Sequence, residues 1–483
     1  MLVVGLLFRL ALLYRIPPLF MPGDSQSFLA PAFDLARGLP FDPILKRPLG
    51  YPLFLASIMV LFGDDPRSIV VVQALLGLGT VAATYWIGRL AYGRAGGAMA
   101  ALTVAVGGQL LIYEHYLLAE SVFALLLALA TLALMLAVRR GRGVALVGGL
   151  ALGSASLFRP IAEVMVPIVP LFFLLAAGSR RRAMVLSAFA GVGFALVLGS
   201  AFVADVTLRG GASSGALGEH LLWRITRSDR GYIGREDVPR GEPDSPRAAA
   251  KRYVVQQAAD RRLPQLIYTA VRRDFGLGAA EADAVLREVA LEAIARQPVR
   301  YVTGTFRMAG ELFFADHQRL GDVSKRDGEP RFSNPQSKQR DWFEERILHL
   351  GEPPSPAVQN EFDRAEAIAA VYQPGRVLPL LAVLVVLGAV FAALGRPNRL
   401  GLLVALTIPP MLLANAALAG PEARFRYPID PLIGVLAAGG LVGAVSLARL
   451  LVVRISSGGR IAATQRDAAA TEPERGVSLS PMR

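Results

Sequence analysis

Two carboxylates stand at the edges of long apolar segments, where an ionised side chain is unfavourable and therefore points to a specific role. Asp24 follows the first apolar segment of the chain, and Glu120 lies about one helical turn inside a later segment that begins at Tyr116. The structural alternatives are a helix N-cap for Asp24 and a hydrogen bond between helices for Glu120. Glu114, just before that segment, is expected to be a solvated turn residue.

Several arginines lie near the same segment ends, where a guanidinium group is well shaped to bind an anion. Arg159 stands directly before Pro160, which ends the preceding helix and leaves an isolated cation at the interface. The alternative for such an arginine is snorkelling to lipid headgroups. The other candidates on these connections are Arg47, Tyr51, Arg424, Arg426 and Tyr427.

Other chemistries lack their signatures in this sequence. The chain has four histidines and none is paired at helical spacing, so no metal-ligand motif stands out. Phosphate-cradling glycine loops, nucleotide fingerprints and serine-nucleophile elbows are also absent. The chemistry is therefore expected to depend on the carboxylates and arginines.

The segments that must position these residues cross a membrane. The chain of 483 residues is 53% hydrophobic, with a mean hydropathy of +0.45. Its apolar runs of roughly 16 to 25 residues match a hydrocarbon core of about 30 Å, and each span should be helical. The sequence predicts an all-α polytopic membrane protein with about ten spans. They are placed at 1–17, 67–90, 96–112, 116–138, 143–159, 161–178, 183–208, 375–394, 399–418 and 428–453.

The distribution of charge predicts the orientation. The net charge is +13, yet residues 209–373 contain 25 basic and 24 acidic residues, so the surplus lies in the membrane half and no nucleic-acid partner is expected. With both termini in the cytoplasm, nearly every short arginine-rich connection falls inside, as the positive-inside rule requires. The outer face then receives 18–66, the Glu114-His115 turn, the Arg159 turn, 209–373 and 419–431. We expect an inner or plasma membrane protein with its active site on that face.

Four regions follow from this layout. They are an N-terminal membrane module (1–208) with a first outer loop (18–66), a non-cytoplasmic and mainly helical domain (209–373), a C-terminal membrane module (374–454) and a disordered cytoplasmic tail (455–483). Two interfacial helices are expected in the first loop, at Ser25–Arg37 and Tyr51–Phe62. In the outer domain, helices are expected at Ser245–Arg262, Ala279–Arg296, Val299–Ala315 and Pro356–Tyr372, and a loop at His317–Ser355.

These features resemble the membrane glycosyltransferases of the GT-C superfamily, in particular family 39-type bacterial proteins similar to dolichyl-phosphate-mannose protein mannosyltransferases and aminoarabinose transferases. The residues that carry the resemblance are Gly23-Asp24-Ser25, Ala36-Arg37-Gly38, Arg47-Pro48-Leu49-Gly50-Tyr51-Pro52, Leu61-Phe62-Gly63, Tyr85 to Gly93, Tyr113 to Glu120, and Glu422 to Pro431. Departures are Ser25 after Asp24, where the family often pairs two acids, and Glu rather than Asp at position 120.

The resemblance implies a hexosyl- or pentosyltransferase that is surrounded by membrane lipids. Its donor would be a polyprenyl-phosphate-linked sugar, and its acceptor would be a lipid, a glycan or a protein. Asp24 would be the base of an inverting transfer, and Glu120 would orient its neighbourhood, bind sugar hydroxyls or help to ligate a divalent cation. Arg159, Arg424 and Arg426, with Tyr427, would hold the donor phosphate. Arg47, Tyr51 and His115 are further substrate-binding candidates. No metal ligand and no cofactor beyond that cation follows from the sequence.

Two other function classes remain open. A transporter or flippase of a lipid-linked substrate would carry charges in mid-span and broken helices near the midplane. A non-enzymatic envelope assembly protein would use 209–373 as a binding module. The clustering of ionisable groups at one rim favours the enzyme.

Overall fold

The computed structural model describes residues 1–16, 18–19, 24–39, 47–209, 216–239, 243–314, 374–395, 398–420 and 423–470. Within these ranges every regular element is a helix, accompanied by one isolated bridge between Leu19 and Tyr116. The expected all-α fold is therefore confirmed. The interfacial helices of the first loop form close to their expected positions, as α2 (Asp24–Ala36) and α3 (Gly50–Phe62).

Five helical stretches are long and apolar enough to cross a membrane. They are Pro66–Ala105, Glu120–Arg140, Arg180–Thr207, Gly401–Leu418 and Tyr427–Leu450. The polytopic membrane protein is confirmed, while the count of ten spans stays a prediction. The remaining helices of the membrane part are α1 (Leu2–Arg15), α5 (Gly108–Tyr113), α7 (Arg142–Phe158), η1 (Pro160–Val164), α8 (Met165–Ala176) and α18 (Pro374–Ala393).

Helix α4 (Pro66–Ala105) contains a sharp break that turns it into two packed halves. Gly93 has φ 81° and ψ −175°, a conformation that interrupts the helix and that residues with a Cβ avoid. The halves lie against each other closely, since a Cβ on Gly88 would lie 2.9 Å from the Cα of Gly97. The two spans expected at 67–90 and 96–112 thus correspond to these halves, although the second half ends at Ala105 and α5 follows.

Small residues also let other membrane helices approach closely. In lipid no hydrophobic driving force brings helices together, so their association depends on close packing. In α9 (Arg180–Arg209), Ala190 lies so near α7 that a Cβ on Gly149 would reach its carbonyl oxygen at 1.9 Å. In α20 (Asp430–Ala470), a Cβ on Gly440 would meet the carbonyl oxygen of Leu384 in α18 at 2.0 Å. These contacts fix the frame that carries the helix ends of the candidate site.

Residues 216–239 and 243–314, in the domain that is expected to lie outside the cytoplasm, contain a helical unit with its own apolar core. This unit is named the outer helical unit after that expectation. Its elements are α10 (Leu217–Trp223), η2 (Arg224–Ser228), η3 (Arg235–Asp237), α11 (Pro246–Ala259), α12 (Pro264–Phe275), α13 (Ala279–Arg296) and α14 (Pro298–Phe313). Three of the four expected helices form, while α10 and α12 were not expected. The predicted helix Pro356–Tyr372 and the loop His317–Ser355 lie outside the described residues.

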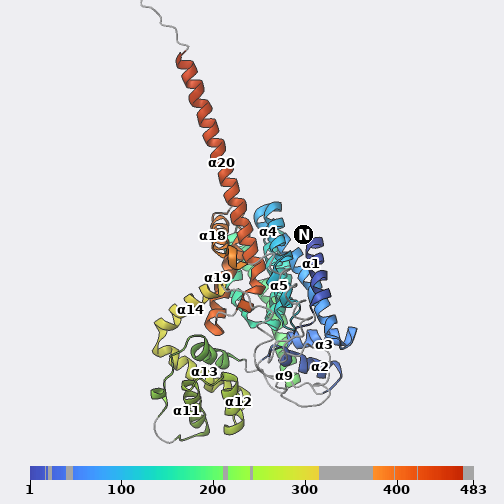
Figure 1. The fold of residues 1–483 in the computed structure, drawn as a ribbon, viewed down its shortest axis with the longest axis vertical. Coiled ribbons are helices and arrows are strands. Elements are labelled where there is room, and N and C mark those ends of the chain that lie inside the picture. Colours follow the sequence, from blue (N-terminus) through green and yellow to red (C-terminus); the bar gives the residue numbers. More distant parts are fainter. Residues whose placement is uncertain are drawn as a thin grey trace, which may run out of the picture.

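Figure 1 shows the N-terminus and the long C-terminal part of α20 at one end of the molecule, and α2, α3 and α11–α13 at the other. The N-terminus and the end of α20 at Ala470 therefore lie on the same side of the membrane part, and the cytoplasmic placement of the termini stays a prediction. The expected disordered tail from residue 455 differs from the structure, in which α20 continues to Ala470. Alanines are frequent in this stretch and favour a helix. Residues 471–483 lie outside the described ranges.

Candidate active site

Asp24 forms the centre of a charged cluster at the start of α2. Its carboxylate forms ion pairs with Arg47, which lies just before α3, and with Arg424 in η5 (Ala423–Phe425). The side chain is 24% exposed, so it stays accessible. Burial alone would raise the pKa of the Asp24 carboxyl, but Arg47 and Arg424 outweigh it and hold that pKa well below its usual range. Asp24 is therefore an ionised carboxylate between two guanidinium groups.

Glu120 forms a second pair with Arg159. Glu120 is the first residue of α6 (Glu120–Arg140), and Arg159 lies between α7 and η1, where the backbone is extended. The Nη1 atom of Arg159 donates to Oε1 of Glu120 at 3.1 Å. A carboxylate at a helix N-terminus is stabilised by the helix dipole. The expected isolated cation at Arg159 therefore has an acidic partner.

Phe425 connects the two charged pairs. The guanidinium carbons of Arg159 and Arg424 each lie 5.0 Å from the centroid of its ring. The structure thus brings together Asp24, Glu120 and two of the arginines expected at a donor phosphate, and Phe425 is a site residue that sequence reasoning missed.

Tyr51 fixes the turn that leads to Glu120. Its hydroxyl donates to the side-chain oxygen of Gln73 at 2.8 Å, and the amide nitrogen of Gln73 donates to the carbonyl oxygens of Glu114 and Tyr116. The Tyr51 ring is fully buried and packs edge-on against Phe28 at 5.1 Å. Tyr51, proposed from the sequence as a substrate-binding residue, occupies a positioning role in this structure.

The first outer loop joins the same turn through its backbone. The amide of Leu19 donates to the carbonyl of His115 at 2.7 Å, and the amide of Leu117 donates to the carbonyl of Leu19 at 3.0 Å. His115 itself is buried. This short bridge holds the segment before Asp24 beside the segment before Glu120, so two carboxylates about a hundred residues apart share one face.

Glu114 is not the solvated turn residue that the sequence suggested. It is buried and accepts a hydrogen bond at 2.5 Å from Nη2 of Arg9, with side-chain exposures of 4% and 2%. Arg9 is a buried residue of α1, which is the first expected span. The hydropathy of this span gave no sign that it contains a charged residue with a buried partner. Gly77 makes room for it, because a Cβ there would lie 1.9 Å from Oε1 of Glu114. An unpaired charge in the membrane is unfavourable, and the carboxylate of Glu114 neutralises the charge of Arg9.

A small hollow adjoins the Arg9–Glu114 pair and Glu120. Its lining includes Arg9, Glu114, Glu120 and Tyr427. Tyr427 belongs to η6 (Tyr427–Ile429), is fully buried and packs against Tyr113 with ring centroids 4.7 Å apart. Tyr427 therefore lines the same hollow as Glu120.

Arg426 points to a different place. Its Nε donates to Asp430 at 3.0 Å and its Nη1 donates to the carbonyl of Phe313 at 2.8 Å. It lines a separate, largely apolar pocket of about 500 Å³ between α4, α5, α18 and α20, together with Gln109. Of the two guanidinium groups expected in this loop, Arg424 is the one that contacts Asp24.

Within the described part of the chain, no three His, Cys, Asp or Glu side chains gather as a metal site would require. A divalent cation at Glu120 stays a prediction. Glu422 lies outside the described residues.

Comparison with protein families gives one match in the membrane half. Residues 46–204 match the family described as dolichyl-phosphate-mannose-protein mannosyltransferase. The match includes Arg47, Tyr51, His115, Glu120 and Arg159, and it confirms the resemblance to the GT-C superfamily over this range. No curated protein matches the chain.

Solved structures with similarity include two membrane proteins. The archaeal oligosaccharyltransferase AglB from Archaeoglobus fulgidus, in complex with an inhibitory peptide and a dolichol-phosphate, is 14% identical with a TM-score of 0.44, over 95% of this chain and 51% of that one. ArnT from Cupriavidus metallidurans, bound to undecaprenyl phosphate, is 13% identical with a TM-score of 0.38, over 93% and 79%. This chain spans about half the length of AglB.

Proposed function

We propose that the chain is a membrane glycosyltransferase that moves a sugar from a polyprenyl-phosphate donor to an acceptor on the non-cytoplasmic face. One observation carries the proposal. The Asp24 carboxylate lies between Arg47 and Arg424, with the Glu120–Arg159 pair across the ring of Phe425. A carboxylate beside several guanidinium groups provides both a proton acceptor and an anion site, which transfer from a sugar phosphate needs together.

The chemistry assigns a role to each group. The acceptor hydroxyl oxygen forms a bond to the anomeric carbon while the bond from that carbon to the phosphate oxygen breaks. The transition state resembles an oxocarbenium ion, and Asp24 takes the acceptor proton as the new bond forms, which inverts the anomeric configuration. The polyprenyl phosphate leaves with the bonding electrons, and the arginines stabilise its charge.

The ion pairs of Asp24 suggest how the base is released. A carboxylate whose pKa is held low by two arginines is a weak base. A donor phosphate carries more charge and more acceptor oxygens, so it would compete for Arg47 and Arg424. As these guanidinium groups turn to the phosphate, the pKa of Asp24 would return towards its ordinary value. Donor binding would therefore activate the base only when a substrate is present.

The family match supports the donor class, because dolichyl-phosphate-mannose is itself a polyprenyl-phosphate sugar. The donor would reach the site from the bilayer. The acceptor would approach from the side of α2, α3 and the outer helical unit. Glu120, held by Arg159, is placed to bind sugar hydroxyls. In this proposal both termini are cytoplasmic and the protein lies in the cell membrane.

One observation favours the transport alternative. Arg9 and Glu114 form a charged pair inside the membrane part, and a transporter is expected to carry such charges. The pair is closed on itself, however, with both side chains almost fully buried. A permeation path would need at least one of them to face a water-filled route. We therefore assign this pair a structural role.

The proposal is tested with the full chain in proteoliposomes supplied with undecaprenyl-phosphate-linked sugars and a crude envelope fraction as acceptor. The expected result is release of undecaprenyl phosphate together with labelled sugar on the acceptor. Movement of intact donor across the bilayer without release of undecaprenyl phosphate would instead support a flippase.

A further inference from the structure

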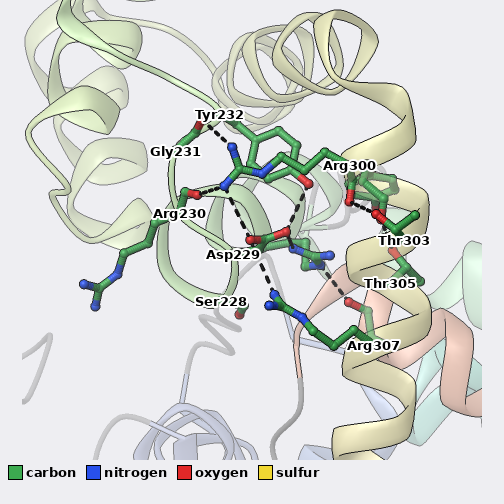
Figure 2. Close-up of polar contacts among 12 residues, drawn as sticks. Ser228, Asp229, Arg230, Gly231, Tyr232, Arg300, Thr303, Thr305 and Arg307 are labelled. Carbon is green, nitrogen blue, oxygen red and sulfur yellow. Dashed lines mark hydrogen bonds and ion pairs between the residues drawn. The ribbon is translucent and has the colours of Figure 1, made fainter.

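A second cluster of arginines lies where the outer helical unit meets the membrane part. Arg224 in η2, and Arg300 and Arg307 on α14, all approach the carboxylate of Asp229. The distances are 3.4, 3.8 and 3.6 Å, and the hydroxyl of Tyr232 also donates to Asp229 at 3.1 Å. Figure 2 shows Arg300 and Arg307 reaching towards Asp229 from the same helix, while the side chain of Arg230 points away. Three cations thus share one central anion.

The cluster is anchored at the end of a membrane span. Arg224 Nε donates to the carbonyl of Ala416, Tyr301 to that of Ala417, and Ser228 to that of Ala419. These carbonyls belong to the C-terminal end of α19 (Gly401–Leu418), whose last carbonyls have no partner within the helix. The three side chains satisfy them, and the positive charge of Arg224 suits the negative end of the helix dipole. The cluster therefore lies at the membrane rim.

Arg224 retains capacity to interact with an anion. Its side chain is fully buried, and its two terminal nitrogens form no hydrogen bond among the described residues, while Nη1 approaches Asp229 at the ion-pair distance of 3.4 Å. A Cβ on Gly304 of α14 would lie 2.7 Å from Oδ2 of Asp229 and 3.2 Å from Nη2 of Arg224, so glycine at this position lets the Arg224–Asp229 pair pack closely against α14. A buried guanidinium with unsatisfied donors is unfavourable unless a further anion approaches.

Arg300 and Arg307 provide the accessible part of the cluster. Their side chains are 43% and 61% exposed. Arg307 contacts Asp229 and Glu311 only at ion-pair distances of 3.6 and 3.7 Å. Glu311 is itself half-exposed, and such surface pairs are weak. The cluster therefore keeps a net positive charge that faces outwards.

The exposed face of α14 points to lipid as the neighbour. Val299, Val302 and Phe306 form an apolar stripe at helical spacing, and Phe306 is 63% exposed. At its other end, Leu312 packs into the core of the membrane helices. A helix with an apolar exposed face beside arginines is typical of one that lies in the membrane interface.

We propose that Arg300 and Arg307, supported by the buried charge of Arg224, bind the phosphate of an anionic membrane lipid while the stripe of α14 inserts beside its acyl chains. The lipid would be a ligand distinct from the sugar donor, since the cluster lies on other elements than Asp24. In Figure 1, α14 lies beside α19 on one side of the molecule, while α2 lies beside α3 on the other side. The bound lipid would fix the outer helical unit against the membrane.

The test titrates the full chain in detergent with phosphatidylglycerol or phosphatidylcholine and counts bound lipid by native mass spectrometry. Wild-type protein should prefer phosphatidylglycerol. Arg307→Gln should weaken that binding about fivefold, since one arginine near a membrane surface contributes about 1 kcal/mol. Asp229→Asn should strengthen it, because the competing carboxylate loses its charge while Tyr232 keeps an acceptor.

The matched controls are Arg235→Gln and Asp260→Asn, which change a similar exposed ion pair elsewhere on the outer unit. Both should leave lipid binding unchanged. Equal binding of the two lipids, or no effect of Arg307→Gln and Asp229→Asn, would overturn the proposal. If inorganic phosphate alone displaced the lipid at equal concentration, the cluster would be a site for free phosphate and the assignment to lipid would be wrong.

Discussion

Asp24 and Arg424 lie 400 residues apart in the chain and form an ion pair at the start of α2. The contact joins the start of α2 to η5, so the N-terminal and C-terminal parts of the membrane protein share a single charged cluster. It also distinguishes between the two arginines of the last loop, because Arg426 turns to Asp430 instead. The predictions below follow from this arrangement.

Arg424→Gln should weaken the binding of undecaprenyl phosphate by about tenfold or more, because a hydrogen bond to a charged group contributes about 1.5–3 kcal/mol. The measurement is a titration of the purified chain with undecaprenyl phosphate, followed by native mass spectrometry. Arg426→Gln is the matched comparison in the same loop. It should leave this affinity nearly unchanged and lower the melting temperature, because Asp430 and the Phe313 carbonyl lose their donor. The reverse pattern would assign the phosphate to Arg426.

The stability contributed by Asp24 should depend on pH with a defined sign. Its pKa is lower in the folded protein than in the unfolded chain, so its ion pairs stabilise the fold above about pH 4 and lose this contribution as the pH falls further. The melting-temperature difference between wild type and Asp24→Asn should stay constant from about pH 8 to about pH 5 and then shrink. A melting-temperature difference that stays the same from about pH 5 down to about pH 3 would show that the pKa of Asp24 is not depressed.

Glu114→Ala should destabilise the protein by about 3–5 kcal/mol, because it leaves Arg9 buried without a counter-charge. Unfolding in detergent by denaturant provides the measurement. The double variant Arg9→Met with Glu114→Met should recover most of the loss, since an apolar pair of similar size replaces the ion pair. A double variant as unstable as Glu114→Ala would mean that the charges themselves are needed.

Gly77→Ala should destabilise the fold by about 1–3 kcal/mol, because its methyl group would lie where the Glu114 carboxylate now sits. Gly191→Ala is the control, since a Cβ at Gly191 in α9 meets nothing within 4 Å. That substitution should be neutral or stabilising, because alanine favours a helix over glycine. Equal effects of the two substitutions would contradict the tight packing around the Arg9–Glu114 pair.

The sequence predicts the parts of this site that depend on local signals. Hydropathy locates the spans, and the position of Asp24 before an amphipathic stretch predicts the start of α2. Glu120 was found because a carboxylate is rare inside an apolar segment. These inferences use only the types and order of residues that are neighbours in the sequence.

Pairings between distant segments could not be predicted in the same way. In the sequence, Arg9 is a single charged residue in a hydrophobic run, and Glu114 is typical of a turn. Only the fold shows that the two side chains form an ion pair. Phe425 carries no signal at all, because its role is to lie between Arg159 and Arg424. The side chains of Arg424 and Arg426 point in different directions because of the 3-10 turns η5 and η6. The helix and strand propensities of these residues do not predict such turns.

The most direct test of the central claim compares Asp24→Asn with Asp64→Asn in the sugar-transfer assay. Asp64 is the matched control, because it also pairs with an arginine of the first loop, Arg37, which forms no ion pair with Asp24 among the described contacts. With both proteins inserted and folded, Asp24→Asn should lower the rate of transfer by about 10²–10⁴-fold, the range expected for a lost general base, while Asp64→Asn should transfer at the wild-type rate. Near-normal transfer by Asp24→Asn would contradict the assignment of the catalytic base.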